Sequence, residues 1–298
     1  MKLDLWEIVL ISVIVPCTDR VMGLEKCLKS ILNQNVSCDF EILLIENNSF
    51  DREVVKDLIK SLHSNMIKHH YLDKCENANV ARNYGAYKSC GKYIAYLDAD
   101  DWWAEDHLDT CLNACKKGAK AVYSGFVLDN GERQVEKYSR AIKDETAYHF
   151  LFNDNKAVAQ TSSFFLSKDI FNSCKWDEKL NRSQDYDFFI EVQKKIGWSY
   201  KPKLTVYVYW EIGAKRSLCG EAFETFYNKH SPFMTNKEIS EYLCEIVKAY
   251  ALVSKEEYHK FSRFIDRYRN YLDRKNSIII SNYYITLIFY KLKVIFKL

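Results

Sequence analysis

The stretch Lys92–Trp103, KYIAYLDADDWW, joins a short apolar run to three carboxylates within four residues. The run up to Leu97 is aromatic and aliphatic, as in a strand that is buried on both faces. Three carboxylates lie where such a strand ends, and they belong to Asp98, Asp100 and Asp101. Ligands bind at this edge of open α/β sheets. Because adjacent carboxylates repel each other, we expect a divalent cation or a helix N-terminus to neutralise them.

An alternative explains the acidic cluster without a ligand. Asp is favoured at helix starts, so the same residues are also typical of an N-cap cluster that opens a helix over Trp103–Cys115. The two interpretations differ in what the carboxylates face, which is a bound cation in one and the N–H groups of a helix in the other.

Composition limits what this cluster can belong to. With 298 residues, 48% of them hydrophobic and 15% aromatic, the chain can bury a full core and is expected to form one large domain with an appendage. The formal charge of +3 gives no field that demands nucleic acid as a partner. No Cys-x-x-Cys pair occurs among the ten cysteines, which favours reduced thiols. Asp4 and Glu7 interrupt the N-terminal apolar residues, which a signal peptide would keep uncharged. These features predict a cytoplasmic globular protein without a signal peptide.

Strand and helix patterns alternate before the acidic stretch. The predicted strands are Ile8–Val15, Phe40–Ile45 and Ile67–Tyr71, and Pro16 is expected to end the first of them. The predicted helices start near Leu24, Val54 and Asn79. The third helix is expected to end at Cys90, with Gly91 as its C-terminal cap. This alternation predicts a doubly wound, mostly parallel α/β sheet with right-handed crossovers. No Gly-x-Gly-x-x-Gly or Gly-Lys-Ser/Thr follows the first strand, so phosphates are expected to be bound in another way, by a metal at Asp100 with help from Arg82.

The remaining patterns complete this domain and add helices. We expect a strand over Ala121–Val127, a turn at Asp129-Asn130-Gly131, a loop over Phe152–Gln160, a strand over Thr161–Leu166, and a helix from Ser183 through Ile196. After Gly220 the pattern becomes helical, over Glu241–Val253 and Tyr258–Tyr271, with a break at Ser231-Pro232.

Four separated motifs carry a resemblance to a known family. They are SVIVPCTDR at Ser12–Arg20, EILLIENNSFD at Glu41–Asp51, ARNYG with GKYIAYLDADDWW between Ala81 and Trp103, and SQDYDFFIEV at Ser183–Val192, together with SILNQ at Ser30–Gln34. In this order and spacing the chain resembles the inverting glycosyltransferases of family 2, which have the GT-A fold. The resemblance implies a GT-A domain over residues 1–220 and a helical C-terminal region over 221–298, which either contacts a membrane or forms a dimer.

The resemblance also implies a site for a nucleotide-sugar. The base would lie against the loop formed by Pro16, Cys17, Thr18 and Asp19, and against Glu46 with Asn47. A carboxylate or amide there can accept the imide N–H of uracil. The family more often has Tyr in place of Thr18 and two Asp in place of Glu46 and Asn47, so the aromatic that stacks on the base is missing from this chain. Uridine is the nucleotide that the resemblance implies by default. The alternative for Glu46 and Asn47 is a plain turn with helix-capping groups.

Phosphates and metal are assigned by the same resemblance. Arg82 would face the donor's phosphates, because a guanidinium binds phosphate oxygens bidentately, and its alternative is a surface ion pair. Asp98, Ala99 and Asp100 look like the DxD motif, in which one carboxylate lies near the ribose and the other holds Mn²⁺ or Mg²⁺ against the diphosphate. The resemblance thus implies that Asp98 and Ala99 bind the nucleotide-sugar and that Asp100 and Asp98 are the metal ligands.

The catalytic base implied by the resemblance is Asp185, which follows Gln184 where the family has Glu. It would take the proton of an acceptor hydroxyl as that oxygen attacks the anomeric carbon, which inverts the configuration. The alternative is a residue that only stabilises the helix N-terminus, and Asp187 competes for either role.

These residues predict an inverting, metal-dependent glycosyltransferase that uses a UDP-sugar to extend a glycan or lipid-linked acceptor in cell-surface polysaccharide synthesis. The family's Arg-x-His histidine is absent from Tyr209–Gly213, where Glu211 is a candidate substitute, and the Gln-x-x-Arg-Trp motif of processive relatives is absent too. The first absence keeps an inactive scaffold or partner subunit as an alternative, and the second favours the addition of one sugar. A sugar-phosphate nucleotidylyltransferase needs a Gly-rich, Arg-containing loop that Pro16–Gly23 lacks.

The C-terminal stretch Ile278–Leu298 is apolar and aromatic and carries Lys291, Lys293 and Lys297. It fits an interfacial helix at anionic headgroups, on the inner face of the cell membrane, or equally a helix that closes a core or a homodimer interface.

Overall fold

The structure is a computed structural model that describes residues 11–18, 21–47, 49, 52–75, 77–153, 157–210 and 220–287. The chain forms two compact units. The first, here called the sheet unit, comprises Met1–Ile142, Val158–Glu178 and Gln184–Trp210. The second, the helical unit, comprises Lys143–Ala157, Lys179–Ser183 and Glu211–Leu298. Every residue of the predicted site belongs to the sheet unit.

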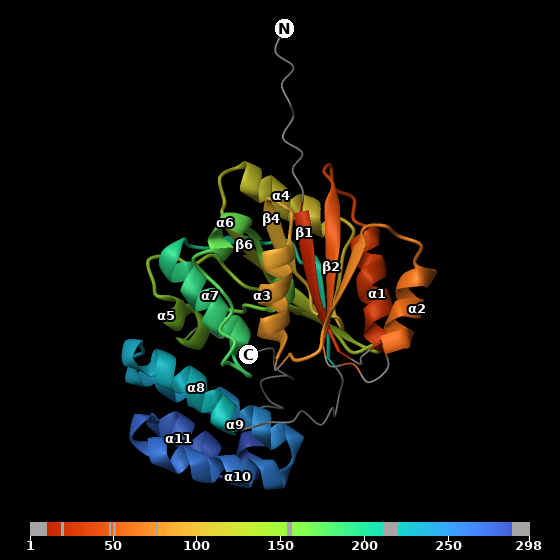
Figure 1. Cartoon of the computed structure of the whole chain (residues 1–298). Coiled ribbons are helices and arrows are strands. Elements are labelled where there is room, and N and C mark those ends of the chain that lie inside the picture. The colour runs from red at the N-terminus through yellow and green to blue at the C-terminus, as the bar shows by residue number, and fades with distance from the viewer. Residues whose placement is uncertain are drawn as a thin grey trace. The chain divides into compact units, whose positions relative to one another are not determined.

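The sheet unit is built on a seven-stranded sheet within the described residues (Figure 1). Its order is β10 (Ser199–Lys201), β6 (Ala121–Ser124), β9 (Phe165–Ser167), β4 (Tyr93–Tyr96), β1 (Ile11–Cys17), β2 (Phe40–Asn47) and β3 (Ile67–Leu72). Strands β4, β1, β2 and β3 are parallel, whereas β9 is antiparallel to both of its neighbours. This arrangement confirms the predicted mostly parallel α/β sheet.

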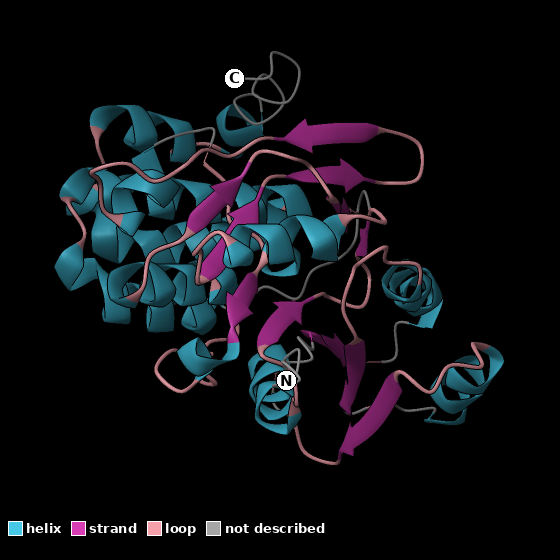
Figure 2. Ribbon diagram, turned by 90° about the horizontal axis from the view of Figure 1, so that it is seen from above, coloured by secondary structure: helices cyan, strands magenta, loops and turns pink. Residues whose placement is uncertain are grey.

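Helices cover both faces of this sheet, as the view from above shows (Figure 2). Helices α1 (Val21–Leu32), α2 (Arg52–Ser61) and α4 (His107–Lys116) share one apolar cluster with Val13, Val15 and Leu44. Helices α3 (Ala78–Lys88) and α7 (Gln184–Lys195) cover the other face, where the ring of Phe188 meets Tyr96 edge-on. Gly85 lets α3 approach the sheet closely, because a Cβ there would lie 2.6 Å from Ile14 Cγ2.

A second sheet lies beside the acidic stretch and corrects one prediction. Its order is β5 (Trp102–Trp103), β11 (Val206–Tyr209), β7 (Phe126–Asp129) and β8 (Gln134–Lys137). The alternative in which the acidic cluster opens a helix over Trp103–Cys115 has the wrong start, since α4 (His107–Lys116) begins four residues later with Asp106 as its N-cap residue. The Trp102 ring stacks on Tyr207 at 5.6 Å, and such cross-strand aromatic pairs stabilise strands. The acidic cluster therefore does not open a helix.

Several predicted boundaries also change. Pro16 lies within β1, in parallel register with Ile45, and Ser89 rather than Gly91 caps α3. The strand expected over Ala121–Val127 divides into β6 and β7 at Gly125, where a Cβ would collide with the backbone of β8. In the loop expected over Phe152–Gln160, α5 (Ala147–Asn153) extends to Asn153 and residues 157–160 are irregular. The strand expected over Thr161–Leu166 is replaced by the 3₁₀ turn η1 (Thr161–Ser163) and the start of β9, after which α6 (Lys168–Phe171) follows.

The helical unit has its own aromatic core. Besides α5, its elements are α8 (Gly220–His230), η2 (Ser231–Phe233), α9 (Asn236–Val253), α10 (Lys255–Ile265), η3 (Asp266–Tyr271) and α11 (Arg274–Ile280). The fully buried Phe226 contacts Tyr242 at 4.8 Å, and Tyr250 stacks on Phe261 at 4.1 Å. Among the described helices, none combines the length and the apolar character that a membrane crossing requires. The tail residues Lys291, Lys293 and Lys297 lie outside the described residues.

Candidate functional site

The carboxylates that follow β4 lie in a tight turn. The Asp101 N–H donates to the Asp98 carbonyl at 3.0 Å, so the chain reverses over Asp98–Asp101. Gly23 of α1 makes room for this turn, because a Cβ at that position would lie 2.9 Å from the Asp100 Cα. Sequence reasoning missed Gly23, and its only signal was a glycine inside a helical pattern.

Asp101 faces the protein interior. Its side chain accepts hydrogen bonds from Ser162 Oγ at 2.6 Å, Gln160 Nε2 at 3.0 Å and the Tyr209 N–H at 3.0 Å. Ser162 Oγ in turn accepts from the Asp98 N–H at 3.1 Å, so one hydroxyl joins both ends of the turn. Burial, together with the charges of Asp98 and Asp100, raises the pKa of Asp101 well above its usual range. Asp101 therefore anchors the turn from its buried side.

Arg82 connects the turn to the start of α7. Its guanidinium donates to Asp98 Oδ1 at 2.7 Å, to Asn79 Oδ1 at 2.9 Å and to Gln184 Oε1 at 3.5 Å. It also lies 4.6 Å from the centre of the Trp176 ring. Only 4% of Arg82 is exposed, so the alternative of a surface ion pair is wrong. Its Nε is buried and has no partner among the described residues.

Two asparagines of α3 bind the segment Trp176–Asp177, whose tryptophan ring lies against Arg82. Asn79 Nδ2 donates to the Asp177 carbonyl at 2.7 Å. Asn83 exchanges two hydrogen bonds with the backbone of Trp176, at 2.9 and 3.0 Å. These contacts fix the tryptophan against the guanidinium. Sequence reasoning missed this support, although asparagines inside a helical pattern were a signal because they disfavour helix interiors.

Asp185 lies in the first turn of α7, next to the Gln184 that Arg82 contacts. Burial raises the pKa of Asp185 to about 6, and the nearby Asp98 adds to this rise. The Tyr186 N–H, which donates to Asp185 Oδ1 at 3.0 Å, and the charge of Arg82 act in the opposite direction. The competing Asp187 is 1% exposed, whereas Asp185 is half-buried. The structure thus brings the DxD-like turn, the guanidinium and the predicted base to one edge of the sheet.

The predicted base-binding residues lie at the ends of β1 and β2. Cys17 and Glu46 are paired in register, so Glu46 and Asn47 belong to a strand and the alternative of a plain turn is wrong for them. The Cys17 side chain is in the apolar core, whereas Thr18 is exposed. Asp19 lies outside the described residues.

The donor atoms at the turn fit a hard cation. Within the described ranges, no group of three or more His, Cys, Asp or Glu side chains is arranged to hold a metal. Mg²⁺ is commonly bound by one or two carboxylates and completed by substrate phosphates and water, and the oxygens of Asp98 and Asp100 meet that requirement. Glu211, the candidate substitute for the family's histidine, lies outside the described residues.

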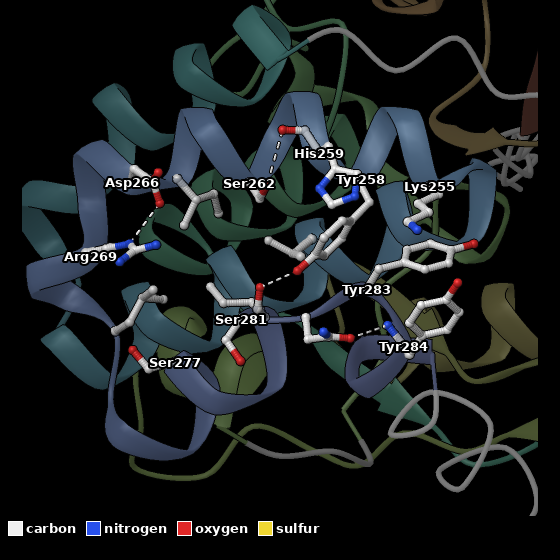
Figure 3. A pocket seen from close by; sticks show the side chains of 15 residues that line it. Lys255, Tyr258, His259, Ser262, Asp266, Arg269, Ser277, Ser281, Tyr283 and Tyr284 are labelled. Carbon is white, nitrogen blue, oxygen red and sulfur yellow. Dashed lines mark hydrogen bonds and ion pairs between the residues drawn. The ribbon is translucent and has the colours of Figure 1, made fainter.

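A cavity of about 390 Å³ lies in the helical unit, away from these residues in the sequence (Figure 3). Tyrosines 258, 283 and 284 line it together with Lys255 and His259. Most of its polar groups are already engaged, as in the Tyr258 hydroxyl that donates to the Ile280 carbonyl at 2.6 Å and the Asp266–Arg269 ion pair at 2.8 Å. No residue of the predicted site lines it.

Comparisons with known proteins identify relatives of this chain. The family model described as "Glycosyl transferase family 2" matches residues 12–175. The amylovoran biosynthesis glycosyltransferase AmsB of Erwinia amylovora is 23% identical over 256 residues, which cover 81% of this chain and 82% of AmsB. The GalNAc(5)-diNAcBac-PP-undecaprenol beta-1,3-glucosyltransferase of Campylobacter jejuni is 30% identical over 133 residues, 43% of this chain and 42% of that protein.

The fold has a counterpart among solved structures. The crystal structure of residues 1–349 of TarS from S. aureus, in complex with UDP-GlcNAc, matches 90% of this chain and 83% of that chain. The TM-score is 0.65 and the sequence identity is 13%, so this likeness concerns the fold.

Proposed function

The chain belongs to glycosyl transferase family 2, and from this we propose that it transfers one sugar from a UDP-sugar to a hydroxyl of a glycan or lipid-linked acceptor, with inversion. The observation that carries the proposal is the position of Arg82. This buried cation contacts Asp98 at the end of β4 and Gln184 at the start of α7. Donor-side and acceptor-side groups thereby come together at the sheet edge where α/β enzymes bind ligands.

Each residue has a role that its surroundings support. Asp185 takes the proton from the acceptor hydroxyl, and a pKa of about 6 leaves it ionised at neutral pH while it remains a useful base. The guanidinium of Arg82, which is held against Asp98, supplies beside the diphosphate a positive charge that cannot be lost. Mn²⁺ or Mg²⁺, held by Asp98 and Asp100, would supply charge neutralisation for the departing nucleoside diphosphate.

The names of relatives support the proposed acceptor class. AmsB and the putative colanic acid glycosyl transferase WcaA of Escherichia coli are named for polysaccharide biosynthesis, and the Campylobacter jejuni protein is named for an undecaprenol-linked acceptor. We therefore place this chain in surface polysaccharide synthesis, at the cytoplasmic face of the membrane where lipid-linked acceptors would be within reach.

A donor panel tests the proposal. Purified protein is incubated with UDP-glucose, UDP-galactose, UDP-GlcNAc or GDP-mannose, with Mn²⁺ or with EDTA, and release of the nucleoside diphosphate is measured. We expect slow hydrolysis of one UDP-sugar that EDTA suppresses. Hydrolysis that EDTA leaves unchanged would contradict the metal site alone. If no donor is hydrolysed and none binds, the chain is a scaffold or partner subunit and the proposal fails.

A further inference from the structure

A histidine outside the motifs lies against the buried carboxylate at the end of β2. His69 of β3 has its Nε2 2.6 Å from Glu46 Oε2. The His69 side chain is 20% exposed and that of Glu46 is 0% exposed. Because a carboxylate accepts hydrogen bonds, the ring nitrogen donates this one. In the parallel register Glu46 lies opposite Tyr71. His69 comes two residues before Tyr71 on β3, so its side chain points to the same face of the sheet as the side chains of Tyr71 and Glu46.

The other oxygen of this carboxylate has no partner within the part of the chain that the structure describes. Glu46 Oε1 is buried and makes no hydrogen bond to any residue that the structure describes. The same holds for Asn47 Oδ1 and Ser49 Oγ, which follow in the chain. Buried polar atoms are nearly always hydrogen-bonded, because an unmade bond costs free energy. Three such atoms at the carboxyl edge of β2 indicate a ligand whose N–H or O–H groups complete them.

We propose that His69 is a positioning residue that fixes how the Glu46 carboxylate is turned, with Oε1 toward the ligand, and that this selects a base with a single ring N–H, uracil or thymine, over guanine. Guanine presents its N1–H and N2–H donors side by side, and both oxygens of a carboxylate pair with them. Uracil and thymine present only N3–H, which needs a single oxygen. The bond to His69 turns Oε2 toward β3, so the two oxygens do not face a base side by side, and Oε1 is the oxygen without a partner among the described residues. This inference rests on the proposed function, since it concerns the base end of the donor site.

Two matched substitutions test the inference through binding. The affinities of the full chain for UDP, dTDP and GDP are measured by calorimetry for the wild type, His69→Gln and His69→Asn. The Gln amide nitrogen takes the place of the histidine Nε2, whereas the Asn amide is too short to reach Glu46. We expect the wild type and His69→Gln to bind UDP and dTDP more tightly than GDP. In His69→Asn this preference should fall about tenfold, as for loss of one hydrogen bond to a charged group.

His70→Asn is the control, because His70 is the next residue on the same strand but points to the opposite face, where its ring meets Tyr84 at 5.7 Å. Its preference for UDP over GDP should equal that of the wild type. If UDP binds but His69→Asn keeps the full preference, the role of His69 is refuted and the proposed function stands. If the wild type binds none of the three nucleotides, the proposed function fails and this inference fails with it.

Discussion

Asp185 shows how the surroundings of one residue shape its chemistry. A carboxyl in the first turn of a helix ordinarily has a lowered pKa, because the helix dipole favours its ionised form. Here burial and the nearby Asp98 outweigh that effect and raise the pKa to about 6. Such a group is still ionised at neutral pH but accepts a proton far more readily than an exposed aspartate does.

The pKa of Asp185 predicts the acid limb of the pH profile. The base must be ionised to act, so kcat/KM for transfer should fall about tenfold per pH unit below pH about 6 and be level above it. Initial rates between pH 4.5 and 8.5 check this, with circular dichroism confirming that the protein stays folded. A midpoint near the ordinary aspartate value of 3.8 would mean that the proton is taken elsewhere.

Gly23 is the second residue whose surroundings predict an effect. In Gly23→Ala the new methyl would lie 2.9 Å from the Asp100 Cα, which must shift together with the rest of the turn. Helix propensity alone would favour Ala by up to about 1 kcal/mol. We nevertheless expect a lower melting temperature and a loss of donor turnover. Glu25→Ala, on the exposed side of the same helix, is the control and should keep full activity.

At the scale of elements, the Asp98–Asp101 turn is held by a buried network. Ser162 of η1 donates to Asp101 and accepts from the Asp98 N–H, and Asp101 in turn accepts from the backbone at the end of β11. The position of the DxD-like carboxylates therefore depends on segments more than sixty residues away in the sequence.

Removing the bridging hydroxyl tests this dependence. Ser162→Ala leaves a buried carboxylate and a buried N–H each without one partner, so the free energy of unfolding should drop by about 1–3 kcal/mol. The KM for the donor should rise as well. Ser163→Ala is a matched control, since Ser163 is equally buried but its hydroxyl bonds only to the Gln160 carbonyl. Urea unfolding and initial rates separate the two variants. Equal KM values in both would contradict the role of Ser162.

The helices and strands differ in how closely the sequence predicted them. Long apolar runs with a clear period, such as those of β2 and α1, were predicted closely, because local pattern alone determines them. The strand at Trp102–Trp103 was not predicted, and one alternative even had a helix begin at Trp103, because the pairing partner Val206–Tyr207 is a hundred residues away. The ion pair of Arg82 with Asp98 and the inward turn of Asp101 depend on the same kind of long-range contact, so the motif located the site without revealing its geometry.

At the scale of the whole molecule, the chain contains two compact units with separate cores. The domain boundary predicted at residue 220 remains a prediction, as do the dimer and the membrane contact of the C-terminal tail. Residues 143–157 and 179–183 belong to the helical unit, although they come earlier in the chain. No continuous boundary in the sequence could have indicated that arrangement.

Separate cores predict a local effect of a core substitution. Phe226→Ala removes a fully buried ring that contacts Tyr242 and His230, which typically costs about 3–5 kcal/mol. Hydrogen exchange should show lost protection in α8 and α9 and unchanged protection in β1 and β2. Phe233→Ala, at a residue 66% exposed, is the control and should change neither. Equal loss of protection in the sheet would contradict the separation into two units.

The most direct test of the molecule's proposed activity compares initial rates of UDP-sugar turnover at pH 7.5 in wild type, Asp185→Asn and Asp39→Asn, an exposed aspartate. Since burial already disfavours the ionised form of Asp185, its replacement by Asn should not lower the melting temperature. We predict that Asp185→Asn loses about 10²–10⁴-fold in rate while Asp39→Asn matches the wild type. An Asp185→Asn variant that is folded and fully active would contradict the account.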